Sequence, residues 1–146
     1  MLFYQYGFYR TPLGSVDSIQ NFAEGEVRET DGIKHSIDLD LVIVGNPRKD
    51  GIPAIDDPSY ESVRAADVYL DDNGYGLMVE VGGRNRFYPY QILVWHEIVN
   101  DTLGGLDLAV TYCPLCFTGV AYEREIGDVL YDFGVSGKLY DNNLLM

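Results

Sequence analysis

Basic residues are scarce in this chain of 146 residues: 10 lysines and arginines stand against 23 aspartates and glutamates, and the net charge is −13. A chain with this charge repels the phosphates of nucleic acids and the headgroups of anionic membranes. We therefore expect neither nucleic acid nor a membrane as a partner. Long apolar runs are also missing, because no stretch approaches the roughly 20 apolar residues of a bilayer-spanning helix.

The amino-terminal stretch MLFYQYGFYRTPLGSV lacks the basic start and the continuous apolar run of a signal peptide. This absence predicts a cytoplasmic location, where cellular reductants keep thiols reduced. Hydrophobic residues make up 47% of the sequence, which is enough for a real core, and the length fits one ordinary domain.

Glycine-centred turns dominate the second half of the chain. Segments 76–90, 92–112 and 119–137 alternate between apolar and polar residues around Gly82-Gly83, Gly104-Gly105 and Gly127-Asp128, a pattern typical of β-hairpins. We expect Arg84 and Arg86, on the outer face of the first hairpin, to be surface residues. The sequence predicts an α+β fold in which antiparallel hairpins predominate.

One short helix is expected near residues 59–70, capped by Asp57 or Ser59, and one strand over residues 37–45. Residues 1–30 are interpreted as an N-terminal arm, and residues 31–146 as a single β-rich domain. The end, KLYDNNLLM, stops within an apolar run. We therefore expect the domain to continue past it, or a partner chain or second copy to complete this C-terminal edge strand.

Cysteine is rare: Cys113 and Cys116, in TYCPLCFTGV, are the only two. A Cys-x-x-Cys turn can form a reducible disulfide, or its thiolates can bind a soft metal such as zinc or copper together with at least one more ligand. The third interpretation is a pair of buried thiols that only fix a turn. A β-rich, glycine-interrupted segment follows the motif, which argues against a thioredoxin fold.

His96 is the candidate third member of this site. If ILVWHEIV is a strand and the hairpin turns at Gly104-Gly105, position 96 pairs with position 113, so His96 would lie opposite Cys113 and within reach of both sulfurs. The alternative is a histidine satisfied within the core. Glu97 and Asp101 are candidate supporting carboxylates or proton carriers.

Four segments resemble the signature blocks of the domain of unknown function 3179 family: DGIPAIDDP, RFYPYQILVWHEIVNDTLGG, VTYCPLCFTGVAYER and FGVSGKLYDNNLLM. The resemblance runs from about residue 40 to the end. Some members of that family are described as selenoproteins, with selenocysteine in place of one cysteine of the Cys-Pro-Leu-Cys block. The resemblance thus implies a redox-active or metal-binding role for Cys113 or Cys116, and a domain that is truncated here at its C-terminal end.

Two hypotheses of function follow. In the first, Cys113, Cys116 and His96 form a thiol redox site, as in a thiol-dependent oxidoreductase, or a soft-metal site. In the second, the chain is a non-enzymatic binding or structural domain whose cysteines are buried and inert. A bound metal, or a thiol pKa well below the usual value of about 8.5, would favour the first.

Overall fold

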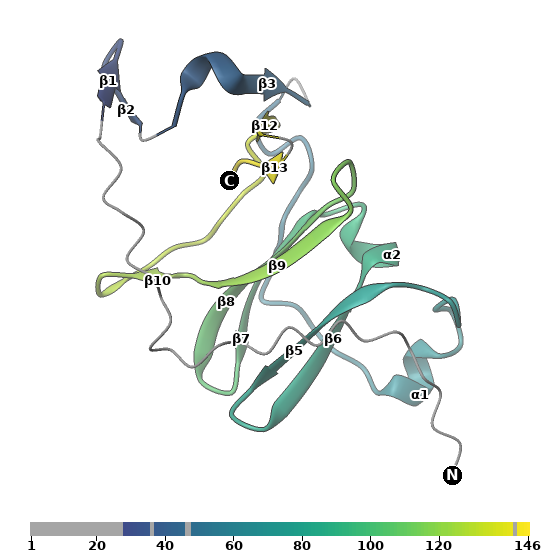
Figure 1. The fold of residues 1–146 in the computed structure, drawn as a ribbon. Helices are drawn as coiled ribbons and strands as arrows, with labels where there is room; N and C mark the ends of the chain where they lie inside the picture. Colours follow the sequence, from purple (N-terminus) through teal and green to yellow (C-terminus); the bar gives the residue numbers. More distant parts are fainter. Residues whose placement is uncertain (1–27, 36, 46–47, 142) are drawn as a thin grey trace.

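The computed structural model describes residues 28–35, 37–45, 48–141 and 143–146 (Figure 1). Its helical segments are short: the 3-10 helix η2 (Leu39–Leu41), α1 (Val63–Ala66) and α2 (Tyr90–Leu93). The strands are β1 (Arg28–Thr30), β2 (Ile33–His35), β3 (Val42–Val44), β4 (Ile55–Asp56), β5 (Gly76–Val81), β6 (Arg84–Pro89), β7 (Ile98–Leu103), β8 (Leu106–Cys113), β9 (Thr118–Glu123), β10 (Glu125–Ile126), β11 (Val129–Leu130), β12 (Lys138–Tyr140) and β13 (Asn143–Leu144). The described fold is β-rich and mostly antiparallel.

A four-stranded sheet in the order β4-β7-β8-β9 forms the centre of the fold. β4 pairs with β7 in parallel, and the other neighbours are antiparallel. The β5–β6 hairpin packs on one face of this sheet, where Val79 and Tyr88 join a buried cluster with Val99, Val110 and Tyr112. Six of the eight residues of β8 are buried, so this strand runs through the core and carries the chain outward to the cysteine turn.

The predicted turns are confirmed in position, but the third hairpin spans only Glu125–Leu130 instead of residues 119–137, because β9 pairs with β8. β5 pairs with β6 across Gly82-Gly83, β7 with β8 across Gly104-Gly105, and β10 with β11 across Gly127-Asp128. In each turn both central residues have a positive φ, which favours glycine and tolerates aspartate. Local turn chemistry therefore set the register of these hairpins.

The helix expected at residues 59–70 is much shorter than predicted. α1 covers only Val63–Ala66, and its N-cap is Ser62, whose hydroxyl accepts from the N–H of Ala65 at 3.3 Å, rather than Asp57 or Ser59. Asp57 has a φ of 46° and Pro58 follows it, so helical backbone does not begin there. Residues 37–45 likewise form η2 and then the short β3 instead of one strand.

The prediction of a strand at ILVWHEIV (residues 92–99) was also wrong for residues 92–97. Tyr90–Leu93 form α2, residues 94–96 turn, and β7 starts only at Ile98. Glu97 has a φ of 59°, which separates the helical turn from the strand. A short apolar run suits a helix or a strand equally, and here tertiary packing chose the helix, with Leu93 buried in the core.

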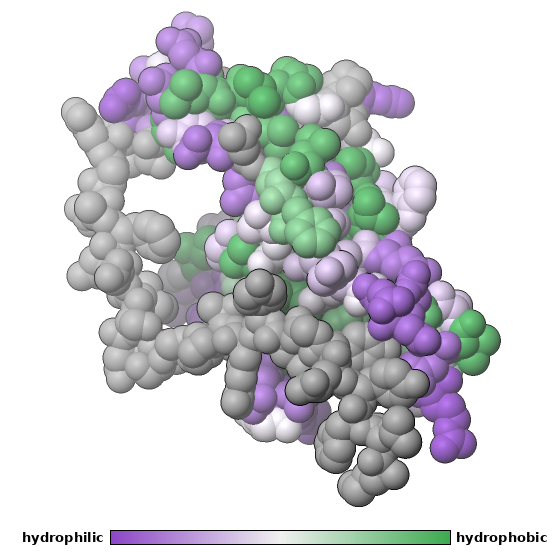
Figure 2. Space-filling view, turned by 45° about the vertical axis from the view of Figure 1, so that its right-hand side comes forward, coloured by the Kyte–Doolittle hydropathy of each residue, from purple (hydrophilic) through white to green (hydrophobic). Residues whose placement is uncertain are grey.

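The predicted N-terminal arm lies mostly outside the described residues. Its proposed boundary at residue 30 falls within the β1–β2 hairpin, in which Arg28 pairs with His35. At the other end, β13 is an outer strand of a small sheet in the order β13-β12-β3. Ile43 and Val44 of β3 are exposed, and Figure 2 shows apolar side chains gathered over the upper part of the molecule, the level at which this sheet lies.

Gly104 and Gly105 offer a matched test of the central turn. Both have a positive φ, 62° and 88°, but a Cβ on Gly104 would lie 2.6 Å from the carbonyl oxygen of Val81, whereas one on Gly105 meets nothing within 4 Å. We expect Gly105→Ala to lower the free energy of unfolding by about 1–2 kcal/mol, the cost of left-handed backbone, and Gly104→Ala to lower it by about 3 kcal/mol or more. Urea denaturation measures both, and equal losses would contradict the packing of this turn against β5.

Candidate functional site

The cysteine motif forms the turn between β8 and β9. Cys113 ends β8 and pairs with Thr118, the first residue of β9, so Pro114 to Phe117 make a four-residue turn. The N–H of Cys116 donates to the carbonyl oxygen of Cys113 at 3.2 Å, and the hydroxyl of Thr118 donates to the carbonyl oxygen of Cys116 at 3.1 Å. These bonds close the turn that carries the two cysteines.

The sulfurs of Cys113 and Cys116 lie close to disulfide distance, and the two residues are paired as a disulfide. Their Cα atoms are 5.3 Å apart, within the range that a disulfide spans. The two residues differ in access: Cys113 is 2% exposed, whereas Cys116 is half-buried. Cys113 therefore lies in the interior, and Cys116 is the more accessible of the two cysteines.

Aromatic rings surround the turn. Tyr90 stacks on Tyr112 at 3.9 Å between ring centroids, and the ring of Phe117 meets both edge-on, at 5.8 and 6.2 Å. Tyr75 packs on Phe117 in the same way at 5.6 Å. Phe117 nevertheless remains 61% exposed and has a φ of 50°, a left-handed conformation that is strained for an aromatic residue. The turn thus displays an apolar ring one residue from the accessible cysteine.

His96 lies in the turn after α2. Its Nδ1 is 2.9 Å from the carbonyl oxygen of Pro53, which can only accept, so Nδ1 carries the proton and Nε2 is a lone-pair acceptor in the neutral ring. The β7–β8 register predicted from the turn at Gly104-Gly105 extends as far as Glu97, because the N–H of Tyr112 donates to the carbonyl oxygen of Glu97 at 2.8 Å. His96 and Cys113 are the next residues along the two paired segments. Their contact through side chains stays a prediction.

The structure contains no preformed metal site among its described residues. Among the residues that the structure describes, no group of three or more histidine, cysteine, aspartate or glutamate side chains could hold a metal ion. A disulfide also has no thiolates to offer a metal. Zinc or copper at Cys113, Cys116 and His96 therefore requires the reduced form.

Asp101 is the centre of a second polar cluster, on the sheet face that packs against β5–β6. Its Oδ2 accepts hydrogen bonds from the hydroxyls of Tyr60 and Tyr88, at 2.6 and 2.5 Å, and from Nη1 of Arg86; its Oδ1 accepts from the N–H of Thr102 at 2.7 Å. Burial opposes ionisation of Asp101, but these donors outweigh it and lower the pKa of the carboxyl group. Burial, together with the hydrogen bond to Asp101, raises the pKa of Tyr60 and of Tyr88.

Arg86 corrects the expectation of a surface residue. Its side chain is 23% exposed, and its guanidinium lies 3.7 Å from the centre of the Tyr60 ring as well as on Asp101. A signal for this existed in the sequence, because alternation along β6 places Arg86 on the same face as the buried Tyr88. Alternation could not place Tyr60, because Tyr60 lies in a loop 41 residues before Asp101 in the sequence.

Glu97, the other candidate carboxylate, sits where the chain enters β7. Burial raises the pKa of its carboxyl group. Its carbonyl group joins it to Tyr112, beside the buried cysteine. Asp101, by contrast, accepts from Arg86 and Tyr88 of the β5–β6 hairpin and from Tyr60 in the loop before α1, and none of these residues belongs to the cysteine turn.

The fold and this turn define a β-rich protein with a Cys-x-x-Cys pair between two strands of its central sheet. The family described as Protein of unknown function (DUF3179) matches this chain over residues 49–146, about two thirds of its length, and the chain belongs to that family. No curated protein and no solved structure matches it. None of the described helices is both long and apolar enough to cross a bilayer.

Proposed function

We propose that this protein is a thiol–disulfide redox protein in which Cys113 and Cys116 exchange between dithiol and disulfide. The observation that carries the proposal is the pairing of one buried and one accessible cysteine in a single closed turn. Thiol–disulfide exchange needs one sulfur that a partner can reach and a second close enough to resolve the mixed disulfide. Cys116 meets the first requirement and Cys113 the second.

The reaction would run in two exchanges. The thiolate of Cys116 attacks one sulfur of a substrate disulfide; that bond breaks, and the other substrate sulfur leaves as a thiolate that takes up a proton. The thiolate of Cys113 then attacks the Cys116 sulfur and releases the second substrate thiol. The substrate gains two electrons and the protein loses two, and a cellular thiol or dithiol restores the reduced protein by the reverse exchanges.

His96 is the proposed proton acceptor for these thiols. Because Nδ1 donates to Pro53, the neutral ring keeps Nε2 as a base. A base that removes a thiol proton raises the fraction of reactive thiolate. In the reduced form, the same three side chains are the candidates to hold zinc or copper, and a metal bound there would block the redox exchange.

A cytoplasmic location, which stays a prediction, is compatible with this chemistry. Cellular reductants in that compartment keep most thiols reduced. The disulfides that do form there are therefore usually transient or catalytic. The alternative function is a non-enzymatic binding or structural domain in which the disulfide only fixes the β8–β9 turn. Pairing of β13 with a second copy or a partner chain also stays a prediction, supported by its outer position in its small sheet.

Equilibration in thiol buffers separates the redox from the structural role. We expect the purified protein to contain no free thiol as isolated under air and two after reduction, and to re-form the disulfide reversibly at potentials near −200 mV, as catalytic pairs do. Thiol counting and mass measurement after acid quenching give the fraction oxidised, and metal analysis of the reduced protein reports bound zinc or copper. A pair that resists reduction down to about −300 mV, in the manner of structural disulfides, would contradict the proposal.

A further inference from the structure

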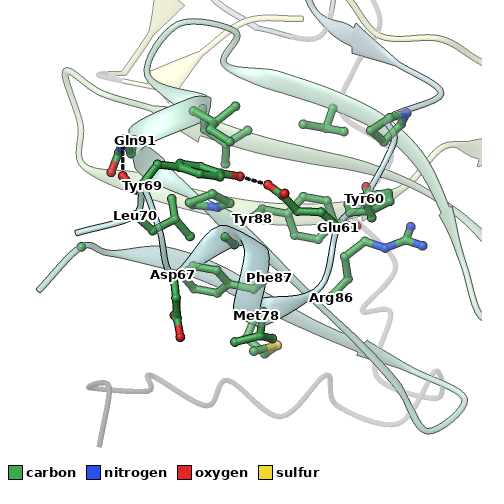
Figure 3. A pocket seen from close by; sticks show the side chains of 18 of the residues that line it. Tyr60, Glu61, Asp67, Tyr69, Leu70, Met78, Arg86, Phe87, Tyr88 and Gln91 are labelled. Atoms are coloured by element: carbon green, nitrogen blue, oxygen red, sulfur yellow. Dashed lines mark hydrogen bonds between the residues drawn. The ribbon is translucent and has the colours of Figure 1, made fainter. Parts of the chain in front are cut away.

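A pocket of about 620 Å³ lies between the segment that carries α1 and the β5–β6 hairpin with α2. This volume is in the range that binds small organic molecules. Figure 3 shows Tyr69 extending along the pocket with its hydroxyl toward Glu61, and Arg86 extending beside Tyr60. Neither cysteine lines the pocket, but Tyr75 in its wall contacts Phe117 of the cysteine turn.

The walls of the pocket are mainly apolar and aromatic. Tyr60, Tyr69, Phe87 and Tyr88 line it, together with aliphatic side chains such as Leu70 and Ile92. Tyr88 is held by its hydrogen bond to Asp101, so its ring is fixed in position. Fixed rings and aliphatic groups favour a ligand with a flat apolar body.

The charged residues that line the pocket indicate which polar group such a ligand carries. Arg86 is the only basic residue among the described lining residues, and Asp101 already neutralises it. The other charged lining residues are the acids Glu61, Asp67 and Asp71. A net negative rim beside aromatic rings attracts a cation and repels an anion.

We propose that this pocket binds an organic cation with an aromatic body, of the arylalkylammonium class. The aryl group packs against Tyr69, whose ring extends along the pocket, and the ammonium group lies at Glu61. This site goes beyond the proposed redox function and does not depend on it, because neither cysteine takes part.

Three probes with the same phenyl body and different heads test the proposal: phenethylamine, phenethyl alcohol and phenylpropionate. Titration of the full chain is followed by amide chemical shifts. We expect phenethylamine to bind with a dissociation constant on the order of 1 mM, as its size allows, and to shift the resonances of the pocket residues. The alcohol should bind several-fold more weakly and the carboxylate at least about 10-fold more weakly.

The variant Glu61→Gln tests the position of the ammonium group. It should weaken phenethylamine about 3- to 10-fold and leave the alcohol unchanged, whereas Glu125→Gln, the same change on exposed β10, should alter neither. Equal affinities for the three probes, a preference for the carboxylate, or shifts confined to residues outside the pocket would overturn the proposal. Loss of the amine preference in Glu125→Gln would also overturn it, because the selection would then come from the net charge alone.

Discussion

Reduced Cys113→Ser protein is expected to react with dithiodipyridine, a neutral aromatic disulfide, on the order of 100-fold faster than reduced Cys116→Ser protein. In the first variant the remaining thiol is the half-buried Cys116 at the turn; in the second it is Cys113, which is 2% exposed. Exchange requires direct approach to the sulfur, so a buried thiol reacts only when the structure opens. Stopped-flow absorbance of the released thiopyridone gives both rates.

Denaturation is the control for this comparison. In concentrated urea both thiols are in unfolded chain, and the two rates should converge within about 3-fold. If they differ as much in urea as in water, the difference is intrinsic to the neighbouring residues and not to burial. Equal rates in the folded proteins, or a faster Cys113, would contradict the assignment of Cys116 as the attacking thiol. Cys113→Ser protein should also retain a stable mixed disulfide with a substrate, since it has no resolving thiol.

Asp101→Asn should lower the free energy of unfolding by about 2–4 kcal/mol. The change leaves the guanidinium of Arg86 without its carboxylate inside the hairpin interface, and removes the charge that holds the hydroxyls of Tyr60 and Tyr88. The partial exposure of Arg86 keeps the loss below that of a fully buried pair. Glu80→Gln, on an exposed position of β5, is the matched control and should change stability by less than about 0.5 kcal/mol.

The pH dependence of this variant follows from the lowered pKa of Asp101. A carboxyl group whose pKa is lower in the folded state contributes stability above its unfolded pKa of about 3.9 and loses it as the pH falls through the folded value. The gap between native protein and Asp101→Asn should therefore be constant from pH 7 to about 5 and narrow below about pH 4. Urea midpoints at several pH values measure this. A gap that widens in acid would show that the carboxyl group is not stabilised by its donors.

Turn chemistry explains how much of the fold the sequence predicted. Gly82-Gly83 and Gly104-Gly105 adopt positive φ with little strain, so both turns are encoded by the residues that make them, and the register of each hairpin follows by counting outward. The same counting from Gly104-Gly105 predicted that the segment of His96 runs alongside the segment of Cys113, as the hydrogen bond between Glu97 and Tyr112 shows. The cysteine pair was evident from spacing alone, since no other cysteine is present.

Tertiary structure decided what local sequence left ambiguous. The apolar run at 90–98 suits either a helix or a strand, and packing of Leu93 into the core gave α2 where a strand was expected. Which cysteine is buried depends on how β8 passes through the core, because the two thiols are chemically alike before folding. The cluster at Asp101 joins Tyr60, Arg86 and Tyr88 from segments up to 41 residues away, and no local pattern encodes a contact over that separation.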